Sequence, residues 1–331
     1  MARWLGAGCR RTDHAFPGFA GQYGAMRIID VDAEKVGTIP LAEVSGLAVG
    51  RNQDGRMTLA AIGDRKATIA WAGAADGIDD LEWQTLALRH AEGTRIPHHD
   101  PQLEAIAIDG ALGLLLVQET PCRAEYIDAP GRAVLAHIAL DIPDDAGTDE
   151  LRASWRDPDG SHAEGVVMLK GGHLLIVKEK DPAALLEFGP AGDSPRGYGP
   201  DRWLDPGEPW WTGAGSASGQ DVHLVLLAAW APTAETVSAC PDLSDAEVGP
   251  RGNLILLSDQ GSSVALVPPA TAAADPFAGS FEATAVWRIS GVGSKPEGIV
   301  VLPDLGVLVA CDRRKVKKNL FVIPRGEWDK D

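Results

Sequence analysis

The chain has 331 residues, of which 45% are apolar and 23% are charged, the proportions of an ordinary soluble globular protein. Its 47 acidic and 30 basic residues give a net charge of −17. This charge argues against partners such as nucleic acid or an anionic membrane surface, which attract Lys and Arg, and it fits cation binding or solubility.

The first 25 residues are expected to form an extension. The run LGAGC within them superficially resembles a lipoprotein cleavage site, but it lacks the apolar stretch of about 7–15 residues that export requires. No later segment approaches the roughly 20 apolar residues of a membrane span. The four cysteines, Cys9, Cys122, Cys240 and Cys311, form no CxxC pair. We therefore expect a cytoplasmic protein with reduced thiols, as a monomer or weak oligomer.

Five segments share one pattern, in which an acid or Ser opens an apolar strand and a second apolar strand ends at another acid. They open at Ser45, Glu104, Glu164, Asp245 and Glu297, and close at Asp64, Glu119, Glu179, Asp259 and Asp312. Opening and closing residues are 19, 15, 15, 14 and 15 positions apart, and successive openings are 59, 60, 81 and 52 positions apart. A four-stranded propeller blade needs about 40–45 residues. The sequence thus predicts an all-β fold, a single β-propeller of five or six four-stranded blades over residues 26–325, with a tail at 326–331.

The strands outside these repeats decide how the ring closes. The last repeat ends with NLFVIP, and MRIIDVD from Met26 is expected to supply its missing outer strand, which would remove exposed sheet edges. The longest gap contains DVHLVLLAAW from Asp221. That segment is either the outer strand of the third blade, after an insertion at residues 190–219, or part of a hidden sixth blade.

The opening acids are predicted to surround the channel mouth, because the start of each first strand and the end of each second strand share one face of a propeller. The inner set is Glu104, Glu164, Asp245 and Glu297, with Ser45 completing it. Acids gathered in this way cannot all stay ionised without a counter-charge, and their oxygens suit Ca²⁺, with Mg²⁺ or Mn²⁺ as smaller competitors. A single acid could instead accept backbone hydrogen bonds that tie blades together. For the ring as a whole we favour a cation or a cationic ligand.

Basic residues follow the closing acids, and the main interpretation is a set of solvated salt bridges. The alternative is a rim that orients an anionic substrate around a metal. Its members would be Arg65, Lys66, Arg123, Glu179, Lys295 and Arg313. His162 and His99, the latter beside His98, are expected on the same face and are candidates for acid–base catalysis. His173 is predicted to lie in a turn on the opposite face.

The insertion carries Trp203, Trp210 and Trp211 in a context rich in Pro and Gly. It is either a lid over the channel mouth or a cover packed on the outside of a blade. The sequence contains no GxSxG, Walker loop, GxGxxG before a helix, or HExxH, so the usual signatures of serine hydrolases, nucleotide-binding proteins and zincins are absent.

The repeats EGVVMLKGGHLLIVKE and PEGIVVLPDLGVLVACD resemble the blades of the SdiA-regulated family and of the domain described as esterase-like activity of phytase. They resemble gluconolactonase/senescence-marker propellers more loosely. The resemblance covers residues 40–323, favours a sixth blade, and implies Ca²⁺ or a similar ion at the channel, with Glu104, Glu164, Asp245 and Glu297 at the matching positions. The chain departs from the pattern at Ser45, and at Ala105 and Ala246, where the motif has Gly.

Together these features predict a metal-dependent propeller enzyme that hydrolyses a phosphoester, a lactone or another ester-containing small molecule. Two alternatives stay open, since fold alone does not decide function. One is a non-catalytic ligand-binding or interaction propeller with a structural ion, and the other is a lyase or cyclase of a specialised pathway.

Overall fold

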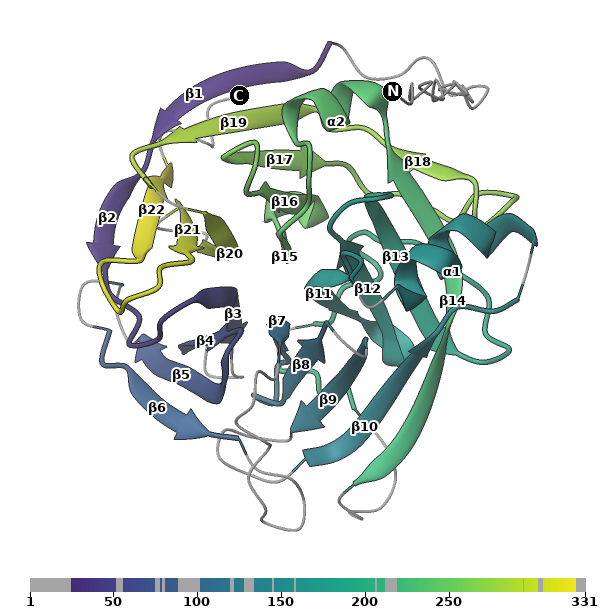
Figure 1. Cartoon of the computed structure of the whole chain (residues 1–331), viewed down its shortest axis with the longest axis horizontal. Coiled ribbons are helices and arrows are strands. Elements are labelled where there is room, and N and C mark those ends of the chain that lie inside the picture. The colour runs from purple at the N-terminus through teal and green to yellow at the C-terminus, as the bar shows by residue number, and fades with distance from the viewer. Residues whose placement is uncertain are drawn as a thin grey trace, which may run out of the picture.

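Strands radiate from a central opening in the computed structural model of the chain (Figure 1). The structure describes residues 25–325 apart from 52–55, 75–77, 79–80, 89–101, 120–121, 128–133, 145, 158, 206, 212–218, 294 and 303–305. In this part the strands form blades, each with one strand at the axis and one at the rim. The all-β propeller predicted from the repeats is confirmed.

Each blade follows the chain from the axis outward. The first comprises β3 (Val44–Arg51), β4 (Met57–Gly63), β5 (Lys66–Ala74) and β6 (Gln84–Ala87). The second comprises β7 (Leu103–Ile108), β8 (Leu114–Gln118), β9 (Arg123–Ile127) and β10 (Val134–Asp141). The third comprises β11 (Ala163–Leu169), β12 (His173–Lys178), β13 (Ala184–Pro190) and β14 (Gln220–Pro232). The fourth comprises β15 (Asp245–Val248), β16 (Leu254–Ser258), β17 (Ser263–Val267) and β19 (Ala285–Ser290). The fifth comprises β20 (Pro296–Leu302), β21 (Gly306–Cys311) and β22 (Leu320–Pro324).

Two N-terminal strands close the ring, as predicted, but the residues that do so differ from the prediction. β2 (Glu34–Gly37) pairs antiparallel with β22 and is the outer strand of the fifth blade. β1 (Arg27–Asp32) pairs in parallel with β19 at the rim of the fourth blade. The run MRIIDVD therefore lies one blade away from the position predicted for it, and the adjoining EKVG completes the fifth blade.

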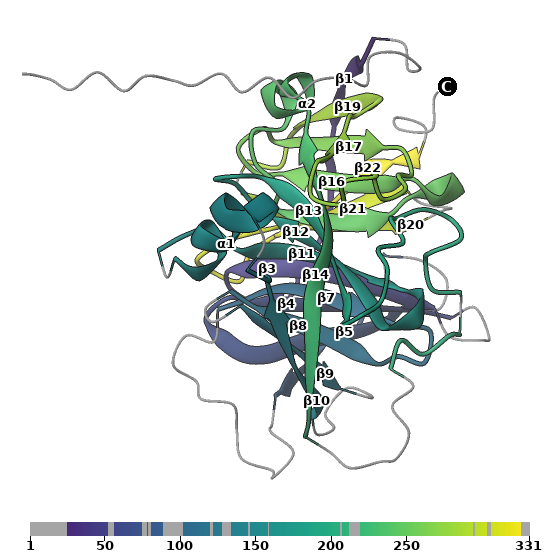
Figure 2. The same cartoon turned by 90° about the vertical axis from the view of Figure 1, so that its right-hand side faces the viewer.

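The long strand β14 joins two blades (Figure 2). It pairs antiparallel with β13 and in parallel with β10, so the second and third blades belong to one nine-stranded sheet that also includes β18 (Gly279–Phe281). The segment DVHLVLLAAW is thus the outer strand of the third blade, as in the first of the two alternatives. The favoured alternative was a sixth blade, but the described residues place five inner strands at the axis: β3, β7, β11, β15 and β20.

Five apolar clusters hold the blades together, one between each pair of neighbours, and the last joins the fifth blade to the first. Side chains of each middle strand alternate between the two sides. Leu174 and Ile176 pack toward the second blade, whereas Leu175 and Val177 pack toward the fourth. Because both faces of a blade are covered, strands such as LLLVQ, HLLIVK and LILLS are buried along their whole length.

Close packing of the inner strands explains the glycine that follows the opening acid in two repeats. A Cβ at Gly165 would lie 2.9 Å from the Cα of Asp245 on the next inner strand. A Cβ at Gly298 would lie 2.8 Å from both the Cβ and the N of Leu47. Real Cβ atoms essentially never approach a neighbour this closely, so the inner strands can meet here only if these positions carry no side chain.

Helices contribute little to the architecture. The described residues contain α1 (Asp149–Arg156), α2 (Ala234–Ala239) and single 3₁₀ turns at Ala146–Thr148, Lys170–Gly172 and Pro250–Gly252. α1 buries Trp155, whose Nε1 donates a hydrogen bond to the carbonyl of Leu140 at 3.3 Å. None of these helices has the length and apolarity needed to cross a membrane. Cys122 and Cys240 are free thiols.

Candidate functional site

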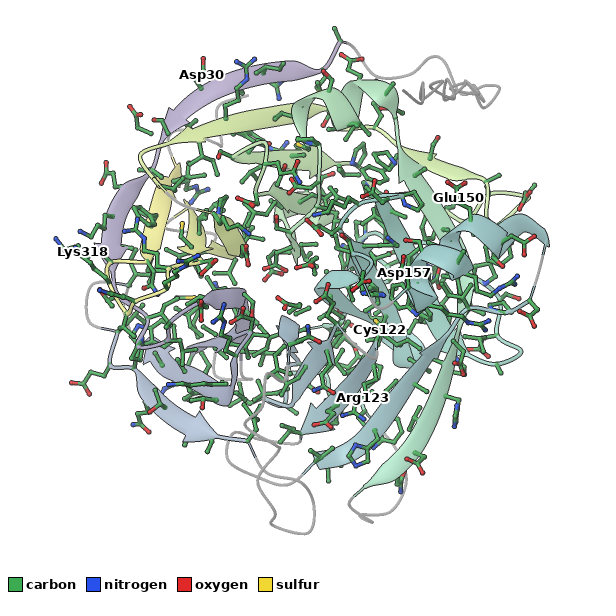
Figure 3. The ribbon with its side chains drawn as sticks, viewed as in Figure 1. Asp30, Cys122, Arg123, Glu150, Asp157 and Lys318 are labelled. Atoms are coloured by element: carbon green, nitrogen blue, oxygen red, sulfur yellow. The ribbon has the colours of Figure 1, made fainter. Side chains whose placement is uncertain are left out.

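Three of the acids that open the repeats are partly buried at one end of the channel, which we call the acidic mouth. They are Glu104, Glu164 and Glu297, at the starts of β7, β11 and β20. Carboxylate oxygens project into the central opening of the ring (Figure 3). The predicted gathering of acids from separate blades is therefore present in the fold.

All three of these acids have raised pKa values. Burial raises the pKa of Glu104 well above its usual range, and the charges of Glu119 and Glu297 raise it further. The pKa of Glu164 is also raised well above its usual range, first by burial and then by the charge of Glu104. Burial raises the pKa of Glu297 to about 7, although the neighbouring Lys295 opposes the shift. Acids from different blades therefore share one poorly solvated space and repel one another.

Asp245, the fourth predicted metal ligand, has a different environment. Its side chain is 1% exposed. One carboxylate oxygen accepts a hydrogen bond from the N–H of Ile299 at 2.8 Å, and the other accepts from the N–H of Ala246 at 2.7 Å. The backbone of Leu47 also donates to this carboxyl. Asp245 thus ties the inner strands of the fourth, fifth and first blades together, the structural role considered for a single acid.

Ser45 makes a second connection between blades. Its side chain is buried, and its hydroxyl donates to the carbonyl of Leu103 on the neighbouring inner strand at 2.5 Å. The first blade therefore contributes a hydrogen-bond donor, in the position where three other blades contribute a carboxylate to the mouth.

The predicted rim residues are mostly engaged within the protein. Arg65 contacts Glu43 at 3.0 Å, and Glu179 pairs with Lys180 at 2.5 Å. Arg123 donates to Gln118 at 2.5 Å, and Arg313 donates to the carbonyl of Val292 at 2.9 Å and lies over the ring of Phe321. These contacts match the salt-bridge interpretation of the rim more closely than a row of free cations.

Lys295 and Lys66 differ from the other rim residues. Lys295 reaches over the mouth, with its Nζ 3.3 Å from Glu297 Oε1 and 3.8 Å from Asp259 Oδ2, and 62% of its side chain is exposed. Lys66 is exposed at the start of β5. Lys295 is therefore the rim cation best placed to meet a ligand at the acidic mouth.

His162 lies directly behind the mouth. Its ring is 2% exposed and edge-on to Trp155, and its Nδ1 is 3.8 Å from Glu119 Oε1. Nδ1 has no hydrogen-bond partner among the described residues. The buried Lys178 donates to the carbonyl of Ser161 at 2.8 Å and so fixes the residue before His162. The other predicted catalytic histidine, His99, and its neighbour His98 lie outside the described residues.

One observation favours a metal ion at this mouth, and another argues against a preformed site. Three buried side-chain atoms of residues placed around the mouth, Asp64 Oδ1, Asp312 Oδ1 and His162 Nδ1, have no hydrogen bond to a described residue. Such orphaned atoms are uncommon in native structures and require an explanation. However, no three His, Cys, Asp or Glu residues of the described chain stand close enough together to hold an ion. The donor chemistry therefore fits a hard cation, but the side chains are not at coordination distance.

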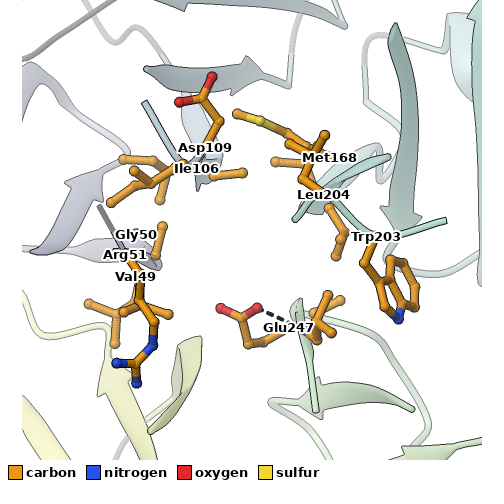
Figure 4. Close-up of a pocket in the computed structure, with 18 of the residues that line it drawn as sticks. Val49, Gly50, Arg51, Ile106, Asp109, Met168, Trp203, Leu204 and Glu247 are labelled. Atoms are coloured by element: carbon orange, nitrogen blue, oxygen red, sulfur yellow. Dashed lines mark hydrogen bonds between the residues drawn. The ribbon is translucent and has the colours of Figure 1, made fainter. Parts of the chain in front are cut away.

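At the opposite end of the channel lies a cavity of about 190 Å³ that the sequence did not predict (Figure 4). Its walls are the far ends of β3, β7, β11 and β15. Glu247 points toward its open centre, and burial raises the pKa of this carboxyl to about 8. A sequence signal was available, because Glu247 occupies the position where the other four repeats have Leu47, Ile106, Val166 and Ile299.

The insertion between β13 and β14 crosses this opposite end. Trp203 forms a bridge to Leu169 at the end of β11, and the backbone N–H of Trp210 donates to Asp109, just after β7, at 2.9 Å. Trp203 and Trp210 are both buried. Neither predicted arrangement, a lid over the acidic mouth or a cover on the outside of a blade, describes them.

A buried histidine anchors the same insertion. His173 begins β12 instead of lying in a turn, and its Nδ1 is 2.8 Å from Glu187 Oε1. Its Nε2 is 3.1 Å from Asp193 of the insertion, and Glu187 also accepts hydrogen bonds from the N–H groups of Arg196 and Gly197. His173 therefore has a structural role.

Comparisons with known proteins find only remote similarities. No protein-family model matches the chain, and no curated protein sequence matches it significantly. A streptogramin B lyase structure shares 9% identity over 84% of this chain and 63% of that one, with a TM-score of 0.36. A protein proposed to be a gluconolactonase shares 12% identity over 89% and 81%, with a TM-score of 0.40. A PQQ-bound aldose sugar dehydrogenase from Streptomyces coelicolor shares 13% identity over 88% and 96%, with a TM-score of 0.39.

The chain spans less than two thirds of the length of the lyase, and 65% of a Bacteroides caccae protein of unknown function. Similarities this low transfer no activity. The resemblance to gluconolactonase-type propellers and the resemblance to the SdiA-regulated family both stay predictions.

Proposed function

We propose that the acidic mouth binds a divalent cation, Ca²⁺ in preference to Mg²⁺ or Mn²⁺, and that the protein is a hydrolase of a small anionic ester, such as a phosphoester or a lactone. One observation carries the proposal. Glu104, Glu164 and Glu297 come from three separate blades and are buried enough to raise the pKa of each, and the charge of Glu297 raises the pKa of both Glu104 and Glu164 further. Charge repulsion of this kind destabilises the fold unless a cation offsets it.

The cation would be held by these three glutamates, with Asp64 and Asp312 close by. Because no three ligating side chains stand at coordination distance in the described residues, binding requires the glutamates to turn toward a common centre. Asp245 is left out of the ligand set, since its carboxylate is already occupied by backbone N–H groups of three inner strands. A cation held in this way would polarise an ester or phosphoryl oxygen of the substrate.

The remaining steps belong to side chains of this chain. Lys295 lies over the mouth, where its ammonium group can pair with an anionic group of the substrate. His162 presents an unpartnered Nδ1 beside Glu119, so it can take a proton from an attacking water and pass it to the leaving group. The ring's contact with Trp155 keeps it oriented.

A second function, a non-catalytic ligand-binding propeller with a structural ion, is favoured by a different observation. Most of the rim cations already pair within the protein, as Arg65 does with Glu43. Fewer free cations mean fewer groups available to orient a substrate. In a binding propeller of this kind, the divalent ion at the mouth would stabilise the fold, and no substrate would be turned over.

The test combines metal binding and turnover. We expect the purified protein to bind Ca²⁺ in calorimetry at pH 8, and Glu164→Gln to weaken that binding at least tenfold because it removes one ligand charge. The exposed Glu150 on α1 gives a matched control (Figure 3), and Glu150→Gln should bind Ca²⁺ as the wild type does. Turnover of generic phosphoesters and lactones should stop in chelator and in His162→Ala.

Each outcome decides between the proposals. Turnover that survives in chelator would refute metal dependence, and turnover unchanged in His162→Ala would refute the assignment of the proton-transfer role. If Ca²⁺ raises the melting temperature of the wild type while no ester is hydrolysed, the binding propeller is the better description. If Ca²⁺ binds neither the wild type nor the Glu150→Gln control, the cation site itself is refuted.

A further inference from the structure

The cavity at the end opposite the acidic mouth has its own set of lining residues. They come from the later parts of β3, β7, β11 and β15 and from the insertion, and they do not include Glu104, Glu164 or Glu297. Asp245, which precedes the cavity-lining Ala246 and Glu247, is buried and hydrogen-bonded to the backbone. An inference about the cavity therefore does not depend on the function proposed for the mouth.

Most of the side chains that line the cavity are apolar. The inner strands contribute aliphatic side chains such as Val49, Ile108 and Met168, and the insertion contributes Leu204 and the ring of Trp203. The volume of about 190 Å³ exceeds the roughly 150 Å³ of an engineered apolar cavity that holds benzene. A molecule with about six to eight non-hydrogen atoms therefore fits.

Two of the carboxylates in the wall are already occupied. Asp109 accepts hydrogen bonds from the N–H groups of Ala111 and Gly113, from the hydroxyl of Tyr126 at 2.6 Å, and from the N–H of Trp210. Asp205 pairs with Lys170 at 2.7 Å. Neither has a reason to attract a further positive charge.

Glu247 is different from both. It accepts one hydrogen bond, from the N–H of the next residue, Val248, at 2.7 Å. Glu247 forms no ion pair with a described residue, and the guanidinium of Arg51 points away from the centre of the cavity (Figure 4). A carboxylate held among apolar walls with one hydrogen bond lowers stability. Its four counterparts in the other repeats are aliphatic.

We propose that this cavity binds a small organic amine, whose ammonium group pairs with Glu247 and whose apolar part fills the space lined by Met168 and Trp203. The chemistry follows from the wall, because a single unpaired carboxylate selects a cation and the apolar surroundings select a hydrocarbon body. Methionine and aromatic side chains add favourable contacts with such a group. The net charge of −17 favours the approach of a cation over that of an anion.

The experiment compares two probes of nearly equal shape, benzylamine and benzyl alcohol, in chelator so that no divalent cation contributes. At pH 8.5, binding is followed by calorimetry and by indole fluorescence. We expect the wild type to bind benzylamine at least tenfold more tightly than benzyl alcohol. Glu247→Gln should remove that preference while it leaves the affinity for the alcohol within twofold.

Two further variants control the result. Asp205→Asn changes a wall carboxylate that is already paired, so the preference for the amine should persist. Val49→Phe fills part of the space and should weaken both probes. The proposal is overturned if benzylamine shows no saturable binding in the millimolar range, if the alcohol binds equally well, or if Glu247→Gln retains the preference. None of these results bears on Ca²⁺ binding at the mouth.

Discussion

Residues at the same position of the repeat have different roles here because their surroundings differ. Glu164 and Asp245 both open an inner strand. Glu164 faces other acids across the mouth, and their charges raise its pKa. The carboxylate of Asp245 instead accepts hydrogen bonds from the N–H of Ala246 on its own strand at 2.7 Å and from the N–H of Ile299 on the next inner strand at 2.8 Å. One carboxylate is thus available for a ligand, whereas the other acts as a structural connection.

This difference can be tested by substitution at Asp245. Asp245→Ala leaves the buried N–H groups of Ile299 and Ala246 without acceptors, which should lower the free energy of unfolding by about 1–3 kcal/mol. Asp245→Asn retains one acceptor oxygen, so its free energy of unfolding should fall by less than half of the loss in the alanine variant. Urea unfolding followed by fluorescence measures both. A loss under about 0.5 kcal/mol in the alanine variant would contradict the structural role.

At the scale of the element, the spacing between inner strands is set by the residue after the opening acid. Gly165 and Gly298 lie where a Cβ would meet the next inner strand at 2.9 and 2.8 Å. Ala105 and Ala246, at the equivalent positions, are buried within interblade clusters. Contact between strands therefore depends on small residues at this one position of every repeat.

Gly298→Ala is the corresponding test. Because the neighbouring strand must move to accept the methyl group, we expect a loss of roughly 1–3 kcal/mol in the free energy of unfolding. Gly73 in β5 gives a matched control, since nothing lies within 4 Å of a Cβ built there. Gly73→Ala should change stability by less than about 0.5 kcal/mol. Equal effects of the two substitutions would show that close packing at Gly298 is not the cause.

Elements buried on both faces were predictable from sequence, and elements at the rim were not. The second strands of the repeats, such as HLLIVK and LILLS, are apolar throughout because both sides pack against a blade. The rim strand EKVG is exposed or half-buried, so its sequence carries no apolar signal, and MRIIDVD was assigned to the wrong blade. Pairing at a sheet edge is decided by tertiary contacts, which a repeat pattern does not contain.

The candidate site was predictable to a similar extent. The repeat spacing placed Glu104, Glu164 and Glu297 at one mouth, since ring symmetry brings equivalent positions together. It could not separate Asp245 from them, because its partners come from strands far away in sequence. The prediction also overlooked Glu247, although an acid among four aliphatic counterparts was visible in the sequence.

Over the whole molecule, acids with raised pKa values make stability depend on pH. Burial raises the pKa of Asp64 to about 6, that of Glu297 to about 7 and that of Glu247 to about 8. In the unfolded chain these groups lose their protons near pH 4. Between pH 4 and pH 8 the folded state therefore binds more protons than the unfolded state, and stability falls as pH rises.

We accordingly expect the melting temperature in chelator to fall steadily from pH 5 to pH 8.5. Ca²⁺ should raise it more at pH 8 than at pH 5, because protons compete with the cation for the same carboxylates. Differential scanning calorimetry across this range measures both effects. A melting temperature that is constant or rises with pH, or an equal gain from Ca²⁺ at both pH values, would contradict this account.

The position of β1 and β2 has a consequence for how the protein is made. These strands leave the ribosome before their partners β19 and β22, and the paired residues Asp32 and Ser290 are 258 positions apart. Pairing across such a separation is slow. The two strands must stay unpaired until β19 and β22 have been synthesised, so the nascent chain exposes strand edges that a chaperone could shield or that another copy could capture.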